Sequence, residues 1–499
     1  MTKRQSSFAA RAAAVSLAVA LHGAAFADGD LASERRGIGL EPASSVGATF
    51  TIDSRRSLAV TDQNIVDLFT FQELVDRLVS PGSVAGLTSP LDFFEHWWDT
   101  QRAGASGTGW HCNNPGTVFN GFPYECPRPE GAQADTNPFV VPPNSDGYRA
   151  VGLFNRFDLA AADGSDCGEY RIVFARRSGI ASAVVRNLVI FEANLANPHP
   201  DRGLNGCVRV AEFWRDLSTD NSQASRGTKL HNFYYEGLPG FLPVVHPKNY
   251  GARADRKGQI RTNQFMRGND PQIQWMLREF KLAQFELCSG MACTTTIQPV
   301  TVKTNPSASL FTDAPTFLNG QFQNELLAQI PQLAVADINR FNYEPSAQFL
   351  TGQSEESNIP ANNYVTSAGP LFKAAIQNKL DSLKVAVSLT PDQVLARVQA
   401  LSCNGCHLIS NGADVGLPQS WPSSQVFTHV SERATQASPD GGTRFAVSPA
   451  LTGTFLPFRN TVLTNYLVRT DPLPRCNESC VTWRGVPAMC VEILVPTIC

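Results

Sequence analysis

The chain has 499 residues, of which 41 are lysine or arginine and 44 are aspartate or glutamate, so its formal net charge at neutral pH is −3. Such balance, with no run of five or six like charges, argues against nucleic acid and anionic membranes as partners. The length exceeds what one hydrophobic core usually organises, so we expect a large domain and at least one smaller one.

The N-terminus predicts a secretory signal peptide. Three basic residues, Lys3, Arg4 and Arg11, precede an apolar run at residues 12–20, and residues 25–27 read Ala-Phe-Ala, a typical cleavage site. The apolar run is too short for a permanent membrane span, and no later stretch approaches the roughly 20 apolar residues that one needs. We expect cleavage after Ala27 and a periplasmic or secreted chain without a membrane span.

The 12 cysteines all follow residue 27. Behind a signal peptide, an even number of cysteines is typical of disulfides. The expected pairs are Cys112 with Cys126, Cys288 with Cys293, Cys167 with Cys207, and two pairs among Cys476, Cys480, Cys490 and Cys499. The pairing within the tail stays open, and Cys403 and Cys406 remain outside this set.

Residues 28–384 predict a large α+β domain with antiparallel β elements. A capping box at residues 70–73 opens a helix whose apolar positions are Phe71, Leu74, Val75 and Leu78. From about residue 148 to 305 strands dominate, because short runs rich in β-branched and aromatic residues recur there. The expected strands are 170–175 and 184–193, with a hairpin of 278–287 and 294–304. Helices are expected at 317–338 and 370–383, and the second has one apolar face made of Leu371, Phe372, Ala375, Ile376, Leu380 and Leu383.

The large domain offers histidines but no recognisable catalytic motif. There is no H-E-x-x-H, G-x-S-x-G, G-x-G-x-x-G or P-loop sequence, and no second C-x-x-C-H. His231 and His246 flank an aromatic loop that could line a pocket, and a buried Arg–carboxylate pair would explain the polar motif at residues 155–158. The domain could bind substrate, dock a redox partner or act as a scaffold. Its histidines are His96, His111, His199, His231 and His246.

Residues 403–407 read Cys-Asn-Gly-Cys-His, the C-x-x-C-H signature of c-type haem attachment. Each thiol adds to one of the two haem vinyl groups, and two intervening residues let both sulfurs reach them. The adjoining histidine then lies beneath the iron as its proximal ligand. The sequence therefore predicts one covalent haem c, held by Cys403 and Cys406 with His407 on the iron.

The residues around this motif resemble a class I cytochrome c domain. Residues 390–393 form a capping box with proline at the first helical position, so a helix leads straight into the motif. A second amphipathic helix around residues 458–467 contains LTNYLV, which resembles the C-terminal helix of that family. The resemblance covers about residues 385–470 and implies a small all-α haem domain there, followed by a cysteine-rich tail at 471–499.

The sequence differs from that family in the second ligand that it offers to the haem iron. Class I domains usually supply a methionine from the loop before the last helix, yet no methionine lies between Met291 and Met489. Within residues 408–468, the only side chains of the types that usually bind haem iron strongly are His429 and a tyrosine of the expected C-terminal helix. We therefore expect bis-histidine ligation by His407 and His429. The alternatives are an open or water-bound iron, or ligation by Met489 or by a histidine of the large N-terminal domain.

Two other chemistries compete with haem at this motif. A C-x-x-C pair also serves thiol exchange, but in thioredoxin-like proteins it follows a strand and opens a helix, whereas here it closes one. A structural zinc site usually needs a second C-x-x-C, and the nearby sequence offers only His429 as a further ligand. Both are weaker interpretations than haem.

Three functions follow from this interpretation. The first is a monohaem electron carrier that serves a redox partner protein, for which six-coordinate iron suffices. The second is a haem oxidoreductase of peroxidase or oxygenase type, whose large domain binds a small-molecule substrate beside an open iron. The third is a non-catalytic binding protein with a structural haem. The sequence favours the electron carrier and leaves open whether the chain is an enzyme.

Overall fold

The computed structural model describes residues 50–79, 90–91, 93–94, 118–124, 137–139, 147–183, 185–265, 273–285, 294–357, 363–383 and 387–469. Within these residues the fold is a mixed α/β structure built on an antiparallel sheet, so the coarse fold class is confirmed. The predicted signal peptide, the tail at 471–499 and the cysteine pairs other than Cys167–Cys207 lie outside them. None of the helices described combines the length and apolar character needed to cross a bilayer.

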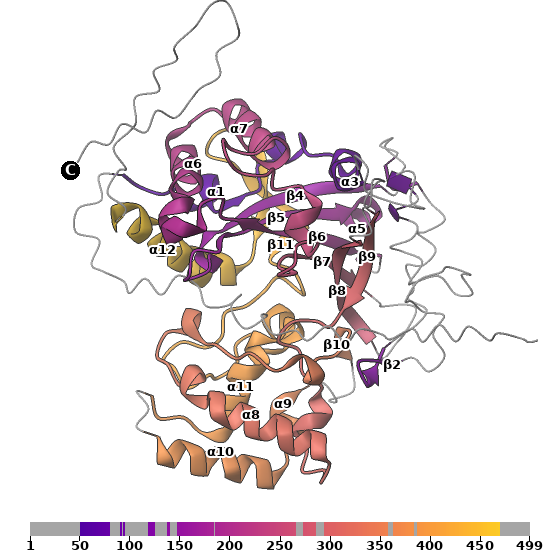
Figure 1. The fold of residues 1–499 in the computed structure, drawn as a ribbon, viewed down its shortest axis with the longest axis vertical. Coiled ribbons are helices and arrows are strands. Elements are labelled where there is room, and N and C mark those ends of the chain that lie inside the picture. The colour runs from indigo at the N-terminus through magenta and orange to yellow at the C-terminus, as the bar shows by residue number, and fades with distance from the viewer. Residues whose placement is uncertain are drawn as a thin grey trace, which may run out of the picture.

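An eight-stranded sheet, counted over the described residues, forms the centre of the protein (Figure 1). Its order is β1-β4-β5-β6-β7-β8-β10, with β9 also paired to β8 as the predicted hairpin. Every neighbouring pair is antiparallel. The strands are β1 (Ala59–Val60), β4 (Tyr148–Arg156), β5 (Asp166–Arg176), β6 (Asn187–Ala196), β7 (Gln259–Phe265), β8 (Ile273–Phe285), β9 (Thr294–Val300) and β10 (Ser354–Ser357).

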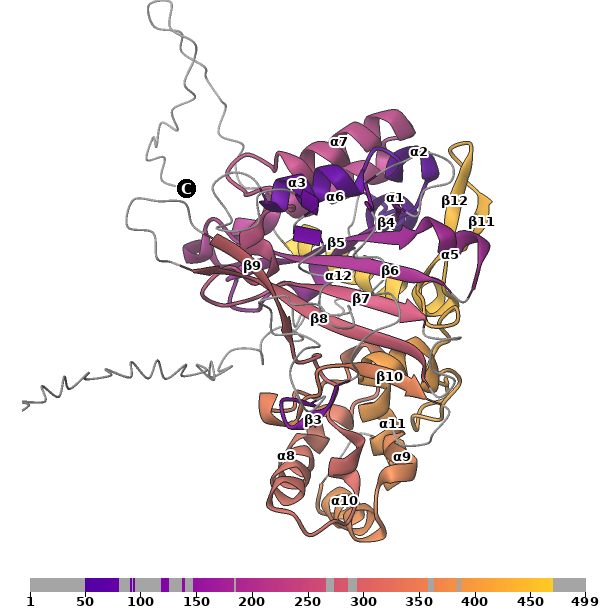
Figure 2. The ribbon, with the colours of Figure 1, turned by 90° about the vertical axis from the view of Figure 1, so that its right-hand side faces the viewer.

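The two faces of the sheet differ because side chains alternate along each strand. On β5, Tyr170 lies on the face that carries α6 (Val208–Thr219), where its ring stacks on Trp214 at 5.8 Å. Arg171, the next residue, belongs to the opposite face. Helices α3 (Phe71–Val79), α6 and α7 (Gln223–Tyr235) lie together over one side of the sheet (Figure 2). One face is therefore an apolar core layer, which leaves the other face for polar residues.

The expectation that strands dominate residues 148–305 missed α6 and α7, which lie inside that stretch. Ser222 caps α7 by accepting a hydrogen bond from the backbone N–H of Ser225 at 3.2 Å. The helix continues to Tyr235, so the first part of the supposed aromatic loop between His231 and His246 is helical. The disulfide between Cys167 and Cys207 is present, as predicted, and ties β5 to the turn before α6.

A group of helices below the sheet has its own hydrophobic cluster (Figure 1). It contains α8 (Phe317–Leu333), α9 (Tyr364–Ser367), α10 (Pro370–Ser382) and α11 (Pro391–Leu401). The capping box predicted for α11 is present in full. Two details of the prediction are wrong: α8 ends at Leu333 rather than near residue 338, and Leu371 of α10 is 73% exposed rather than on the apolar face.

The all-α cytochrome unit expected at residues 385–470 is not confirmed. After α11 come the π-helical turn η10 (Gly405–Ile409), a hairpin of β11 (Val430–Ala437) and β12 (Thr443–Val447), the turn η11 (Leu451–Phe455) and α12 (Leu456–Arg469). The two helices do not pack on one common core. Helix α11 belongs to the helical cluster, whereas α12 packs on the sheet domain, where Tyr466 contacts the ring of Phe157 at 4.7 Å.

Candidate functional site

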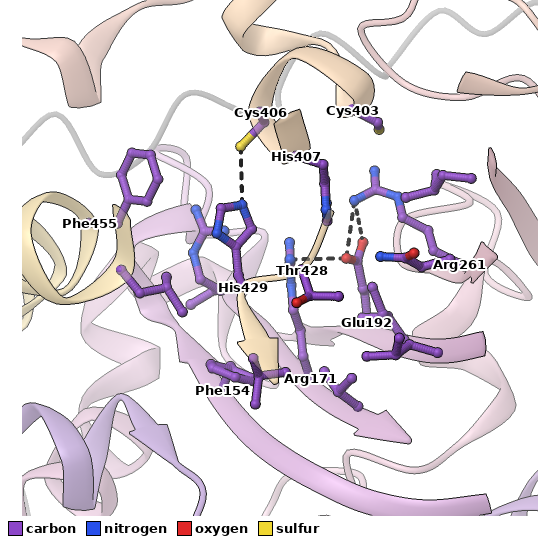
Figure 3. A pocket seen from close by; sticks show the side chains of 18 of the residues that line it. Phe154, Arg171, Glu192, Arg261, Cys403, Cys406, His407, Thr428, His429 and Phe455 are labelled. Atoms are coloured by element: carbon purple, nitrogen blue, oxygen red, sulfur yellow. Dashed lines mark hydrogen bonds and ion pairs between the residues drawn. The ribbon is translucent and has the colours of Figure 1, made fainter. Parts of the chain in front are cut away.

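A pocket separates the C-x-x-C-H segment from the polar face of the sheet. It holds about 1030 Å³ that protein atoms do not fill, part of which opens to solvent. The cavity volume that can be compared with those of known ligand pockets is about 200 Å³, below the roughly 300–1,000 Å³ that such pockets commonly measure. In Figure 3, Cys403, Cys406 and His407 project from the segment above, and Arg171 and Glu192 rise from the strands below.

The C-x-x-C-H segment, residues 403–407, forms the roof of the pocket. A hydrogen-bond network around the end of α11 holds this segment in place. Ser402 donates its hydroxyl to the Gln399 carbonyl at 2.7 Å, and Gln399 donates its side-chain amide to Asn404 at 3.0 Å. Asn404 in turn donates to the Glu355 carbonyl of β10 at 3.0 Å. These bonds tie the residues on both sides of Cys403 to α11 and to the sheet edge, so the first cysteine has a defined position.

Gly405 is required by close packing. A Cβ atom built at this position would lie 1.7 Å from the carbonyl oxygen of Gln399, far inside any allowed contact. Only glycine therefore lets the chain turn under α11 so that Cys406 and His407 reach the pocket. The two cysteines are half-buried and are not disulfide-bonded to one another.

His407 is held in one orientation by a ring contact and a hydrogen bond. Its imidazole stacks on Trp275 of β8, with centroids 5.3 Å apart and 26° between the ring planes. Nδ1 lies 2.6 Å from the carbonyl oxygen of Phe427, which can only accept, so Nδ1 carries the proton. Phe427 adopts a left-handed backbone (φ 65°), and Asn263 also donates to its carbonyl at 2.9 Å.

Burial lowers the pKa of His407 to about 4, against a smaller raising effect of the Phe427 hydrogen bond. The imidazole is therefore neutral at physiological pH, with the lone pair of Nε2 left for a metal. Metal-binding histidines typically donate their other ring N–H to a carbonyl or carboxylate, which fixes the ring and raises its basicity. The residues around His407 fit this pattern.

His429 lies beside Cys406. Its Nε2 is 3.4 Å from the Cys406 sulfur, its Nδ1 is 2.9 Å from the Ser448 hydroxyl, and its ring centroid is 5.0 Å from that of His407. Burial, followed by His407, lowers the pKa of His429 well below its usual value, so this imidazole is neutral too. The structure thus brings His429 into the pocket beside the predicted haem residues, and its role as distal ligand stays a prediction.

The floor of the pocket is a charged network on the polar face of the sheet. Arg171 and Glu192 are cross-strand partners joined at 3.0 Å, and Arg261 bonds to Glu192 at 2.9 Å and to Glu279 at 3.0 Å. Burial alone would raise the pKa of Glu192, but Arg171 and Arg261 bring it below its usual value. Apolar side chains also line the pocket, among them Phe154, Val173, Leu188, Ile190, Leu451 and Phe455.

Sequence reasoning missed this floor. Arg171 and Glu192 each stand inside a strongly apolar strand run, and a charged residue in such a run is a signal of a buried ion pair. The pair predicted at residues 155–158 is present: Arg156 binds Asp158 through Nε at 3.0 Å and Nη2 at 2.8 Å, at one end of the pocket.

The other candidate histidines lie elsewhere or outside the described residues. His231 on α7 bonds to Glu73 at 3.1 Å, and His246 accepts a hydrogen bond from the backbone N–H of Lys248. Neither these two nor His199 lines the pocket. His96, His111 and Met489 fall outside the described residues.

The residues fit a c-type haem: two neighbouring thiols, a neutral histidine with a fixed ring, and a pocket with apolar walls. No group of three or more His, Cys, Asp or Glu side chains suited to a metal ion occurs in the part of the chain that the structure describes. Haem iron needs only one or two protein ligands, so that observation does not bear on it. Comparisons with protein-family models, curated proteins and solved structures find no significant match to this chain.

Proposed function

We propose that the chain is an exported c-type haem protein that transfers single electrons. Cys403 and Cys406 would hold one haem through thioether bonds, and His407 would be the proximal ligand. Addition of each S–H across a vinyl double bond bonds the sulfur to one carbon and the hydrogen to the other, so it needs no oxidant. The observation that carries the proposal is the neutral, ring-locked His407 beside two thiols at the pocket.

The surrounding residues suit a redox role. A bound haem supplies an iron that gains and loses one electron. Trp275 and the Phe427 carbonyl hold the His407 ring, so the proximal imidazole would keep its orientation in both states. The hydrogen bond at Nδ1 makes Nε2 a stronger donor, which favours the oxidised iron and a lower reduction potential. If His429 is the second ligand, it lowers that potential further compared with a methionine.

Export is part of the proposal because the first 27 residues predict a signal peptide. Cleavage after Ala27 would deliver the chain to the periplasm or the exterior, where disulfides such as Cys167–Cys207 persist. The partner would then be a redox protein or a small molecule of the same compartment.

The test is the intact mass of protein exported by cells competent for cytochrome maturation. We expect the mass of the chain from residue 28 plus one haem, and an absorption spectrum of a c-type haem. The Cys403→Ser/Cys406→Ser double variant should lose the added mass, and His407→Ala should change the spectrum. His246→Ala, a histidine outside the pocket, is the control. A wild-type protein exported without haem would overturn the proposal.

A second candidate function is a haem oxidoreductase. It is favoured because the pocket lies between the C-x-x-C-H segment and the sheet of the large domain. The large domain supplies a charged pocket floor, which suits a bound substrate beside the iron. Carbon monoxide separates the two candidates: the spectrum of the reduced protein stays unchanged if two protein ligands hold the iron, and shifts if one position is open. If His429→Ala alone creates that shift, His429 is the second ligand.

A further inference from the structure

Four arginines line the pocket, and three of them form hydrogen-bonded ion pairs with carboxylates. Arg156 is bound by Asp158 through two nitrogens. Arg171 and Arg261 both bind Glu192. Arg171 also binds Glu169, and Arg261 also binds Glu279. The fourth, on α12, is Arg459.

Arg459 differs from the other three in its bonding. The carboxylate nearest to its guanidinium is Asp158, with 3.8 Å between the Arg459 Nε and an Asp158 oxygen, too far for a hydrogen bond. Both oxygens of Asp158 already accept from Arg156. A guanidinium carries five N–H donors, and none from Arg459 makes a hydrogen bond to the residues that the structure describes.

This unbonded cation is nine-tenths buried. The Arg459 side chain is 10% exposed and lines the pocket. Burial, followed by the neighbouring charge of Arg156, lowers the pKa of Arg459 to about 9, so the group stays charged at neutral pH in surroundings that disfavour its charge. Buried charges in proteins are normally paired and hydrogen-bonded. An anion in the pocket would provide that pairing.

The surroundings indicate the class of anion. Four arginines line the pocket but Glu192 is the one carboxylate in its described lining, so the charged side chains that border it carry an excess of positive charge. The nearby walls are apolar, with Phe455 and Leu451 from the preceding turn. A planar guanidinium fork matches a carboxylate, and apolar walls suit an organic acid better than a small inorganic anion.

We propose that Arg459 is the carboxylate-binding residue of the pocket, and that its guanidinium bonds to the carboxylate of a ligand with an apolar body. Two sources carry this chemistry: a propionate of the covalent haem itself, or a free organic acid bound beside it. In the first form the inference rests on the proposed function. In the second form it stands even if no haem is present.

The test compares the exported protein with Arg459→Gln, Arg459→Lys and Arg433→Gln. Arg433 is an exposed arginine on β11 away from the pocket and serves as the matched control. Lysine keeps the charge and loses the planar fork, so it separates carboxylate bonding from a change of charge. Thermal unfolding of each variant checks that it is folded.

The first measurement is the resonance Raman band of the haem's propionate groups. If a propionate is the partner, Arg459→Gln shifts this band, Arg459→Lys shifts it less, and Arg433→Gln leaves it unchanged. The second is a calorimetric titration with benzoate, an organic carboxylate with an apolar body. If the partner is a free acid, Arg459→Gln weakens benzoate binding roughly 10- to 100-fold, the range of a charge-assisted hydrogen bond.

The results separate failure of this inference from failure of the proposed function. If Arg459→Gln matches the wild type in both measurements, Arg459 does not bind a carboxylate, whatever the haem content. If the intact mass shows no haem, the proposed function has failed, and the benzoate titration alone decides the role of Arg459. An equal loss of benzoate binding in Arg433→Gln would also overturn the inference, because it would show a general effect of charge.

Discussion

Among single residues, two kinds of relation build the site: the local spacing of Cys403, Cys406 and His407 in the chain, and the pairing of Arg171 with Glu192 across two strands. Cys403, Cys406 and His407 are recognisable because their chemistry depends on a fixed local spacing. Arg171 and Glu192 meet only because β5 and β6 pair in one particular register. That register depends on long-range contacts along both strands, so no local pattern could have joined these two residues.

Gly405 gives a sharp prediction at this scale. Gly405→Ala places a methyl group against the Gln399 carbonyl, so the turn that carries Cys406 must move. We expect a loss of about 3 kcal/mol or more in the free energy of unfolding, measured by chemical denaturation, together with lower haem content.

The control is Gly320→Ala, at an exposed position of α8 with nothing within 4 Å of the added carbon. There the loss of chain entropy in the unfolded state should raise the stability by about 0.5–1 kcal/mol. Equal effects of the two substitutions would mean that the close approach at Gly405 is not a real constraint.

At the scale of elements, local signals predicted the helices that carry clear caps. The capping boxes at residues 70–73 and 390–393 both mark real helix starts, and the buried positions of α3 are those expected. Helix α7 was missed although Ser222 caps it, because its aromatic end reads like a strand or a loop. Propensity in short segments is weak, and packing on the sheet decides their structure.

The β11–β12 hairpin is held at its turn by an ion cluster. Asp440 accepts hydrogen bonds from Arg56 of α1 (Ser54–Ser57) and, at 2.8 Å, from Arg226 of α7, whose side chain is fully buried. Asp440→Asn removes the counter-charge, so we expect a loss of about 2 kcal/mol in the free energy of unfolding at pH 7. Asp201→Asn, at an exposed position, should change it by less than about 0.5 kcal/mol.

The pH dependence of this effect has a definite sign. The hydrogen bond from Arg56, which outweighs the opposing effect of burial, leaves the pKa of Asp440 below its usual value. The stabilisation is therefore complete above about pH 4 and is lost as the pH falls through the folded-state pKa. The free energies of unfolding of the wild type and Asp440→Asn, measured by chemical denaturation, should converge as the pH falls below the folded-state pKa of Asp440. A constant difference down to pH 2 would contradict this account.

At the scale of the whole molecule, the sequence predicted an α+β protein but not how its C-terminal part is divided between two cores. The domain boundary expected between residues 384 and 385 lies outside the described residues, yet α10 and α11 on either side of it share one hydrophobic cluster. Helix α12 belongs to the sheet core, where Asn460 also donates to the Ile52 carbonyl at 2.8 Å. The core that a helix joins depends on the elements that pack against it, and the sequence of the helix alone does not identify those elements.

This division predicts that residues 385–470 do not fold alone. Expressed with a signal peptide in a maturation-competent strain, this fragment should lack a cooperative thermal transition, because α11 and α12 each lose their packing surface. The chain from residue 28 to 470 is the comparison and should unfold cooperatively. Circular dichroism on both proteins would decide, and a well-folded haem fragment would support an independent cytochrome domain.

The separation of roof and floor along the chain also sets an order of events in the cell. Synthesis delivers β5, β6 and β7 long before residues 403–459, so the sheet can assemble while the face that will border the pocket is still bare. Docking of α12 then completes the enclosure. If the proposed haem is bonded to these two sulfurs, its attachment is easiest before that final step. Haem attachment and closure of the pocket would then compete in time, and slower docking of α12 should favour a higher yield of haem-loaded protein.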